Sequence, residues 1–210
     1  MRRKEFAMGD ENIEDVIAFL EEMTFGFLGT IGEDGYPNIT PLNYVYYNGD
    51  LYFHGSKIGE KMSTLVANSK VSFSVAKEYA IIPSYMNNPK YACPATAFFK
   101  SVLFRGQAEV VHDLQVKCDV FTTFMEKLQP EGGYDAIVPS DQGYAKQVAA
   151  AAIVKIRVEE MTSKFKFGQN WSEKKMNKVA DQLIDRDHKL DQDTVKLMKQ
   201  YCPHIKGDGN

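Results

Sequence analysis

The sequence predicts a mostly β fold, a small antiparallel β-barrel with flanking helices and a C-terminal helical extension. Short aromatic and β-branched runs over 25–55 are interrupted by turn signals, which indicates a meander of strands. Two longer segments, 71–82 and 98–111, alternate apolar and polar residues, as strands with one buried face do. One amphipathic helix lies early in the chain and others lie late, which is typical of a barrel decorated by helices.

The first part of the chain begins with a predicted amphipathic helix over 11–23, where apolar residues recur every three or four positions. Three antiparallel strands follow, at roughly 25–32, 37–47 and 50–55. The dipeptide Asn48-Gly49 lies between the last two strands. It suits a two-residue hairpin turn, because both residues adopt positive φ at low cost.

The rest of the chain mixes helices and strands. Residues 58–67 return to helical spacing, and an amphipathic helix is predicted from Leu114 to Leu128. A proline-rich excursion over 83–97 separates the two long strands, and a last strand is predicted at about 149–158. Residues 172–201 form a helical tail too small to fold alone, so we expect it to pack on the barrel or on a partner subunit. The predicted domains are 1–171 and 172–210.

Composition limits the function classes. The 210 residues suffice for one well-buried domain with an appendage, and a net charge of −3 argues against a nucleic-acid partner. The longest apolar run, 148–154, is far too short to span a membrane, and no apolar signal segment follows the basic start of the chain. Three widely spaced cysteines favour a reduced, cytoplasmic setting, and no Cys/His cluster has the spacing of a metal site.

The segment "LYFHGSKIGEKM" (51–62) carries the clearest chemistry. A predicted strand ends at His54, Gly55 and Ser56, and a helix begins a few residues later. Lys57 and Lys61 would share one helical face with Thr64. The helix N-terminus, a hydroxyl and two lysines together make an anion site that suits a phosphate. The alternative is a solvated helix face beside a structural histidine.

Three ordered motifs resemble a known family. They are "GTIGEDGYPNITPLNYVYYNGDLYFHGSKIGEKMSTLVANSKVSFSV" (29–75), "FFKSVLFRGQAEVV" (98–111) and "SKFKFGQN" (163–170). Together they resemble the flavin-binding split-barrel superfamily that includes pyridoxamine 5'-phosphate oxidase. Within it, the Nim-type nitroimidazole reductase branch is the most similar. The resemblance covers roughly residues 1–171.

This resemblance implies an antiparallel, Greek-key-like split β-barrel that binds FMN at the interface of a homodimer. Ser56, Lys57 and Lys61 would hold the phosphate, and the backbone of 41–43 would run beside the flavin ring. Lys100 and Ser101 would reach the flavin from the long strand, often across the dimer. The full set of implied cofactor-binding residues is Pro41, Leu42, Asn43, His54, Gly55, Ser56, Lys57, Lys61, Lys100, Ser101, Lys164, Gln169 and Asn170.

His54 is the candidate catalytic residue, because an imidazole could donate a hydrogen bond to a nitro or carbonyl oxygen as it is reduced. Its alternative roles are to orient the flavin or to pack against Tyr52. Tyr85, Tyr91 and Phe98 could line the substrate side, although aromatic residues there are more often packing. Cys93 could lie near the flavin or act as a small buried apolar residue.

The leading hypothesis is an FMN-dependent oxidoreductase that reduces small electrophilic compounds, such as nitroaromatics or quinones. Electrons would come from a nicotinamide cofactor or from a separate electron carrier. Oxidation of pyridoxamine phosphate is not expected, because the arginine-rich closing segment of that oxidase has no counterpart in this sequence. The alternatives are a non-catalytic flavin- or haem-binding protein that acts in storage, sensing or haem handling, and a purely structural protein.

Overall fold

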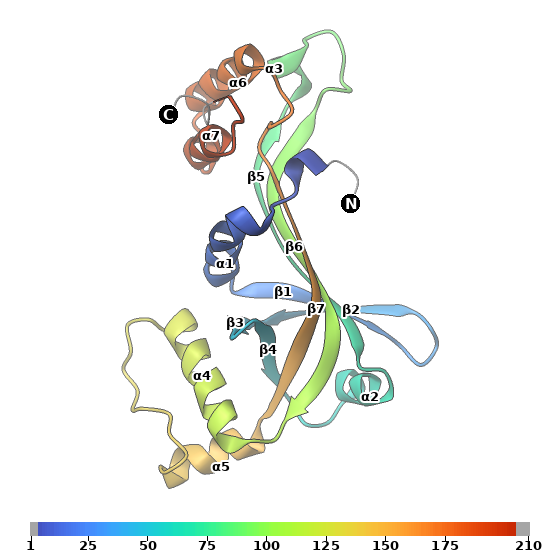
Figure 1. The fold of residues 1–210 in the computed structure, drawn as a ribbon, viewed down its shortest axis with the longest axis vertical. Helices are drawn as coiled ribbons and strands as arrows, with labels where there is room; N and C mark the ends of the chain where they lie inside the picture. Colours follow the sequence, from blue (N-terminus) through green and yellow to red (C-terminus); the bar gives the residue numbers. More distant parts are fainter. Residues whose placement is uncertain (1–3, 205–210) are drawn as a thin grey trace. The chain divides into compact units, whose positions relative to one another are not determined.

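The computed structural model describes residues 4–204. In this part of the chain the strands form one seven-stranded sheet in the order β2-β1-β5-β6-β7-β4-β3 (Figure 1). The strands are β1 (Phe25–Ile31), β2 (Pro37–Asn43), β3 (Val45–Tyr47), β4 (Asp50–Gly55), β5 (Lys70–Ile82), β6 (Thr96–Val111) and β7 (Ala152–Lys166). The α-helices are α1 (Ile13–Glu22), α2 (Glu60–Ala67), α3 (Ser84–Asn87), α4 (Leu114–Leu128), α5 (Gln142–Ala150), α6 (Glu173–Arg186) and α7 (Asp191–Gln200).

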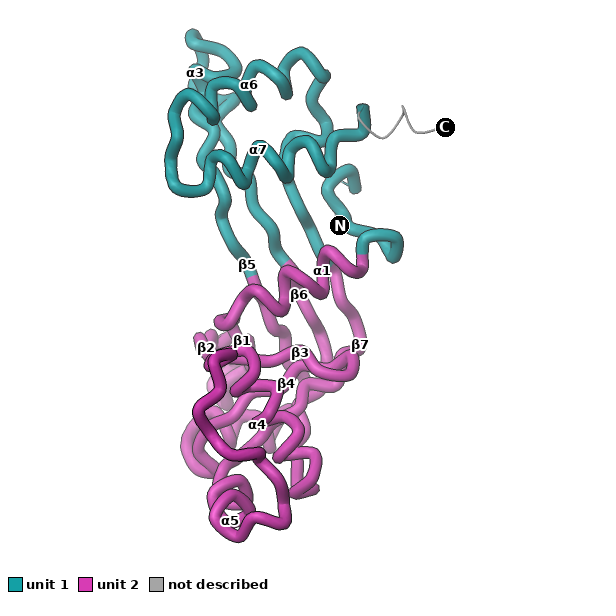
Figure 2. Tube along the Cα trace, turned by 90° about the vertical axis from the view of Figure 1, so that its left-hand side faces the viewer, with its two compact units in different colours: residues 1–12, 76–101, 163–210 teal, residues 13–75, 102–162 magenta. Residues whose placement is uncertain are grey.

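The chain forms two compact units (Figure 2). The barrel unit contains residues 13–75 and 102–162. The terminal unit contains the described parts of the chain before residue 13 and after residue 162, together with 76–101. The strands β5, β6 and β7 each begin in one unit and end in the other. The predicted tail therefore belongs to the same compact unit as the ends of the long strands.

In the barrel unit, the prediction of one strand over 37–47 is wrong in one respect. The segment forms two strands, which are separated at Tyr44. The strand β2 pairs with β1, whereas β3 pairs with β4, and these two strands take opposite edges of the sheet. Since one residue joins the two edges, the sheet must curl into a split barrel, which confirms the predicted fold class. Tyr44 fixes this break: its side chain is buried, and its hydroxyl donates to Leu20 O at 2.9 Å.

The hairpin between β3 and β4 has the predicted two-residue turn. Asn48 and Gly49 both have positive φ, 51° and 85°, and Tyr47 pairs with Asp50. Helix α4 covers this part of the sheet through a buried cluster. The cluster contains Val45, Tyr52, Val120, Phe124 and Ile153. The predicted bounds of α4 are confirmed, and Asp113 caps it by accepting from Val116 N at 2.9 Å.

Two predictions near the C-terminal half of the barrel unit differ from the structure. Residues 149–150, predicted as the start of a strand, end helix α5, which Asp141 caps by accepting from Tyr144 N at 2.8 Å. Alanine has the highest helix propensity, so this alanine-rich run favours the helix. The strand β7 then begins at Ala152 and continues to Lys166, well past the predicted end at 158.

In the terminal unit, the tail forms the two predicted helices, α6 and α7, and packs within its own chain. Tyr201 stacks on Phe167 with ring centroids 5.7 Å apart. Arg186 pairs with the buried Asp191 and also donates to Ile81 O at 2.8 Å, which ties the tail to β5. Of the helices in 4–204, none has the length and apolar character required to cross a bilayer.

Candidate functional site

A small polar pocket lies between helix α2 and the inner face of the β1–β2 hairpin, all within the barrel unit. Thr30 and Asn38 face each other across the two strands, and Thr40 lies two residues further along β2. From α2, Glu60, Lys61 and Thr64 complete the polar lining of a space of about 270 Å³. The three strand residues, Thr30, Asn38 and Thr40, lie on one side of the sheet because paired residues, and strand residues two apart, point the same way.

Lys61 is the cation of this polar pocket. Its ammonium lies 5.1 Å from the centre of the Phe53 ring. It also lies beside Gly55, where a side-chain carbon would come within 3.3 Å of Nζ. Burial lowers the pKa of Lys61 from its ordinary value. A half-buried ammonium beside a glycine and two threonines can donate hydrogen bonds to an anion, because the glycine leaves room for the anion to approach the backbone.

The loop between β4 and α2 separates the two predicted lysines. Gly59, with φ of 120°, precedes the first residue of α2, so Lys57 lies outside the helix. The predicted common helical face therefore holds for Lys61 and Thr64 but not for Lys57. Lys57 Nζ donates instead to Ala149 O at 2.7 Å. Ser56 Oγ accepts from the backbone N–H of Ile58 at 3.2 Å, which stabilises the loop.

The His54 side chain points to the face of β4 opposite that of Phe53 and Gly55, toward helix α4. Its ring lies 5.8 Å from the ring of Phe121 and 5.2 Å from that of Phe124. Burial lowers its pKa below the ordinary value of 6.5, and the positive charge of Lys61 adds to the effect. His54 is therefore neutral at pH 7, and its catalytic role stays a prediction.

The predicted ring-binding backbone, 41–43, lies on β2 at the edge of the sheet. Pro41 faces Phe27 across the hairpin, and a proline is tolerated there because an edge strand makes ladder bonds on one side. The Leu42 side chain is buried, while Asn43 Nδ2 donates to Thr24 O at 2.8 Å. The outer edge of β2 thus offers backbone groups to a ligand.

The other predicted site residues lie in the terminal unit. Lys100 is buried, with Nζ 4.9 Å from the centre of the Phe165 ring, and Ser101 points to the opposite face of β6. Lys164 Nζ lies 5.6 Å from the centre of the Phe99 ring.

The closing segment of the motif also lies in this unit. Gln169 is used locally, since it donates to Phe165 O at 2.6 Å and accepts from Phe167 N at 2.8 Å. Asn170 and the exposed Cys93 line a separate cavity of about 320 Å³.

The residues that the sequence reasoning missed are Thr30, Asn38, Thr40 and Glu60. The sequence did contain one signal of this pocket: Asn38 and Thr40 are polar residues at alternate positions of one strand, so their side chains share a face. Their pairing with β1 depends on the register of the hairpin, which periodicity alone does not give.

The curled sheet defines a split-barrel protein, and its polar pocket groups one ammonium with hydroxyl and amide side chains. The chain belongs to the pyridoxamine 5'-phosphate oxidase family, whose model matches residues 12–165, and the resemblance inferred from the motifs is thereby confirmed. Comparison with curated proteins gives no match.

Solved structures of the same fold include three from bacteria. A candidate 5-nitroimidazole antibiotic resistance protein from Bacteroides thetaiotaomicron is 21% identical, with 75% of this chain and 85% of that chain covered and a TM-score of 0.58. A flavocytochrome from Azotobacter vinelandii is 20% identical, with coverage of 79% and 72% and a TM-score of 0.60. A FAD and haem binding protein from Mycobacterium smegmatis is 16% identical, with coverage of 78% and 76% and a TM-score of 0.57. At these identities the likeness concerns the fold.

Proposed function

We propose that this protein is an FMN-dependent oxidoreductase that reduces small electrophilic compounds of the nitroaromatic or quinone type. The observation that carries the proposal is Lys61, held beside Gly55 in a polar pocket of a pyridoxamine 5'-phosphate oxidase family member. The relatives of this fold named above as a flavocytochrome and as a FAD-binding protein support a flavin.

The polar pocket suits the phosphate end of FMN. Its lining offers one ammonium from Lys61, hydroxyls from three threonines and the amide of Asn38. Hydroxyls, amides and cations are the groups that bind phosphate oxygens. Glu60 is the single carboxylate in the described lining, and it opposes an anion, so the pocket is not optimised for charge.

The flavin ring requires more room than this pocket provides, since small-molecule sites usually exceed about 300 Å³. The outer face of the β1–β2 hairpin is apolar and exposed, with Phe27 at 45% and Ile39 at 64% exposure. Exposed apolar patches of this kind mark interaction sites. A second copy of the chain that covers this face would enclose the ring against 41–43 and make the protein a homodimer.

In this proposal the bound flavin supplies the electron transfer, and the chain positions it and the substrate. Lys61 holds the phosphate. For His54, neutral at pH 7, to donate one N–H to a substrate oxygen, the substrate has to approach the face of β4 that carries Phe121 and Phe124 of α4. Electrons come from a nicotinamide cofactor or from an electron carrier protein.

The test is the visible spectrum of the purified protein, followed by identification of the released cofactor and a turnover assay. Release of FMN and NAD(P)H-dependent bleaching of a nitroaromatic would support the proposal. If a carrier donates the electrons, a dithionite-reduced sample should still be reoxidised by the nitroaromatic. A haem absorption band without flavin, or a protein that binds neither, would contradict it. For the dimer, Phe27→Glu, outside the polar pocket, should sediment as a monomer, whereas Ile184→Glu, exposed in the terminal unit, should not.

A further inference from the structure

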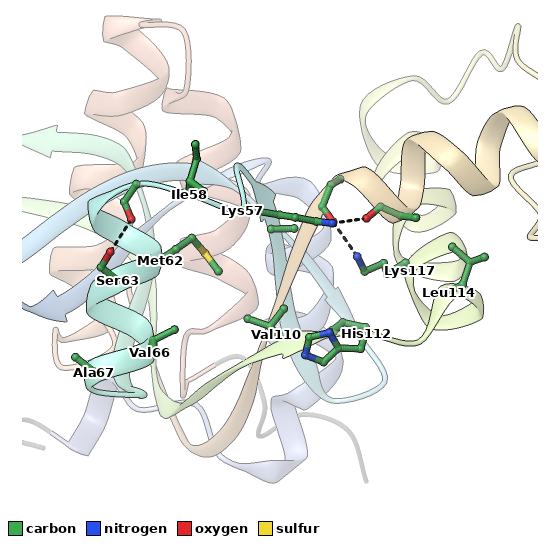
Figure 3. Close-up of a pocket in the computed structure, with 15 residues that line it drawn as sticks. Lys57, Ile58, Met62, Ser63, Val66, Ala67, Val110, His112, Leu114 and Lys117 are labelled. Atoms are coloured by element: carbon green, nitrogen blue, oxygen red, sulfur yellow. Dashed lines mark hydrogen bonds between the residues drawn. The ribbon is translucent and has the colours of Figure 1, made fainter.

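A second, larger pocket lies in the barrel unit on the other side of helix α2 (Figure 3). It has a volume of about 900 Å³ and is lined mainly by aliphatic side chains from α2, the end of β6, the start of α4 and the end of α5. Ile58 and Val66 lie in its lining and are 83% and 81% exposed. Apolar pockets of this size bind small organic molecules.

One end of this apolar pocket carries two ammonium groups. Lys117, on α4, is buried at 6% exposure and donates to Ala151 O at 2.8 Å. Lys57 donates to Ala149 O at 2.7 Å, and both side chains point toward the end of α5 in Figure 3. Burial lowers the pKa of Lys117, and the positive charge of Lys57 adds to this effect.

The charges at this end of the pocket do not balance. The end of α5 contributes roughly half of one negative charge from its free carbonyls, against two ammonium groups. Among the described residues that line the pocket, none carries a carboxylate. Each ammonium has three N–H donors but bonds to one protein acceptor among the described residues. A buried cation with spare donors is costly unless an anion accompanies it.

The apolar pocket is distinct from the polar pocket, although both use α2. Lys61 and Thr64 face the polar pocket, whereas Met62 and Val66 face the apolar pocket. In the loop before α2, Lys57, Ile58 and Gly59 line the apolar pocket, and no residue of this loop lines the polar pocket. A ligand in the apolar pocket would therefore leave the phosphate site open.

We infer that the apolar pocket binds an organic anion, a carboxylate on an aliphatic body, with the carboxylate against Lys57 and Lys117 and the hydrocarbon against α2 and β6. The aliphatic lining provides the affinity for the body, and the two ammonium groups select the charge.

The test is isothermal titration calorimetry of the purified protein, with its flavin if present, using octanoate, octanol and octyltrimethylammonium. Octanoate should bind about tenfold or more tightly than octanol, because the alcohol lacks the charge-assisted contacts. The octyltrimethylammonium cation should not bind. Octanoate should leave the flavin absorbance unchanged.

Variants locate the site. Lys57→Met, at an exposed position, and Lys117→Met should each weaken octanoate about tenfold and leave octanol unaffected. Lys146→Met, exposed on α5 and outside the pocket lining, is the matched control and should bind as wild type.

Three results would overturn the inference. The first is that octanoate does not bind to the wild type, which would be the result if a second copy of the chain covered the pocket. The second is equal affinity for octanoate and octanol, and the third is release of flavin by octanoate.

Discussion

Replacing Lys61 by alanine tests the phosphate site most directly. The ammonium lies beside Gly55 and above the Phe53 ring, and burial lowers its pKa from the ordinary value. A hydrogen bond from a charged donor contributes about 1.5–3 kcal/mol. Lys61→Ala should therefore weaken FMN binding by about 10- to 150-fold.

The assay is a fluorescence titration of apoprotein with FMN and, in parallel, with riboflavin. Riboflavin lacks the phosphate, so its affinity should hardly change in Lys61→Ala. Lys57→Ala is the structural control, because Lys57 Nζ binds Ala149 O and its side chain lines the apolar pocket. FMN affinity should remain near that of wild type in this variant.

Two results would refute the reasoning. Equal losses for FMN and riboflavin in Lys61→Ala would mean that the lysine supports the fold or the ring and not the phosphate. A larger FMN loss in Lys57→Ala than in Lys61→Ala would mean that Lys57 leaves Ala149 when the ligand binds.

Four further predictions follow from single groups. Glu60→Gln should tighten FMN binding several-fold in the same titration, because it removes the carboxylate from the pocket lining; weaker binding would contradict this. As pH falls below 6.5, the unfolded chain protonates His54 before the folded protein does, so the free energy of unfolding should fall, and His54→Phe should flatten this part of a urea-denaturation pH profile. Burial lowers the pKa of Lys127 to about 8, so between pH 8 and about pH 10 the unfolded chain holds this proton more firmly; the wild type should gain stability over Lys127→Met there, and parallel profiles would oppose the assignment. Arg186→Met should cost about 3–5 kcal/mol of unfolding free energy by leaving Asp191 buried and unpaired. Arg105→Met, which breaks an exposed pair with Glu160, should cost less than about 1 kcal/mol; similar losses would mean that burial of the Arg186 pair is unimportant.

Much of the fold was predictable because its signals are local. The stripe of α4, the turn at Asn48-Gly49 and the helices of the tail depend on residues within a few positions of one another. The break at Tyr44 was not predictable, because the apolar runs on its two sides join without a turn signal. What separates β2 from β3 is a contact with Leu20, more than twenty residues earlier in the chain.

The candidate site was predicted in part for the same reason. Gly55 and Lys61 lie in one short segment, and the structure places them together. Lys57 was assigned to the same face because the spacing assumes a continuous helix, whereas the φ of 120° at Gly59 turns the chain first. Thr30 and Asn38 meet through strand pairing, and their partnership depends on the length of the loop between two strands.

The single-residue link at Tyr44 also has a consequence for the order of folding. The hairpins β1–β2 and β3–β4 are each made of contacts close in sequence, so each can form early and independently. The strands β5, β6 and β7 then have to enter between them, at the cost of closing long loops. Tyr44 is the single residue between the two hairpins, and it is held by its hydrogen bond to Leu20 O and by its contact with Lys127. We therefore expect the contacts of Tyr44 to form before β5, β6 and β7 complete the barrel. The folding rate should then depend on this one tyrosine.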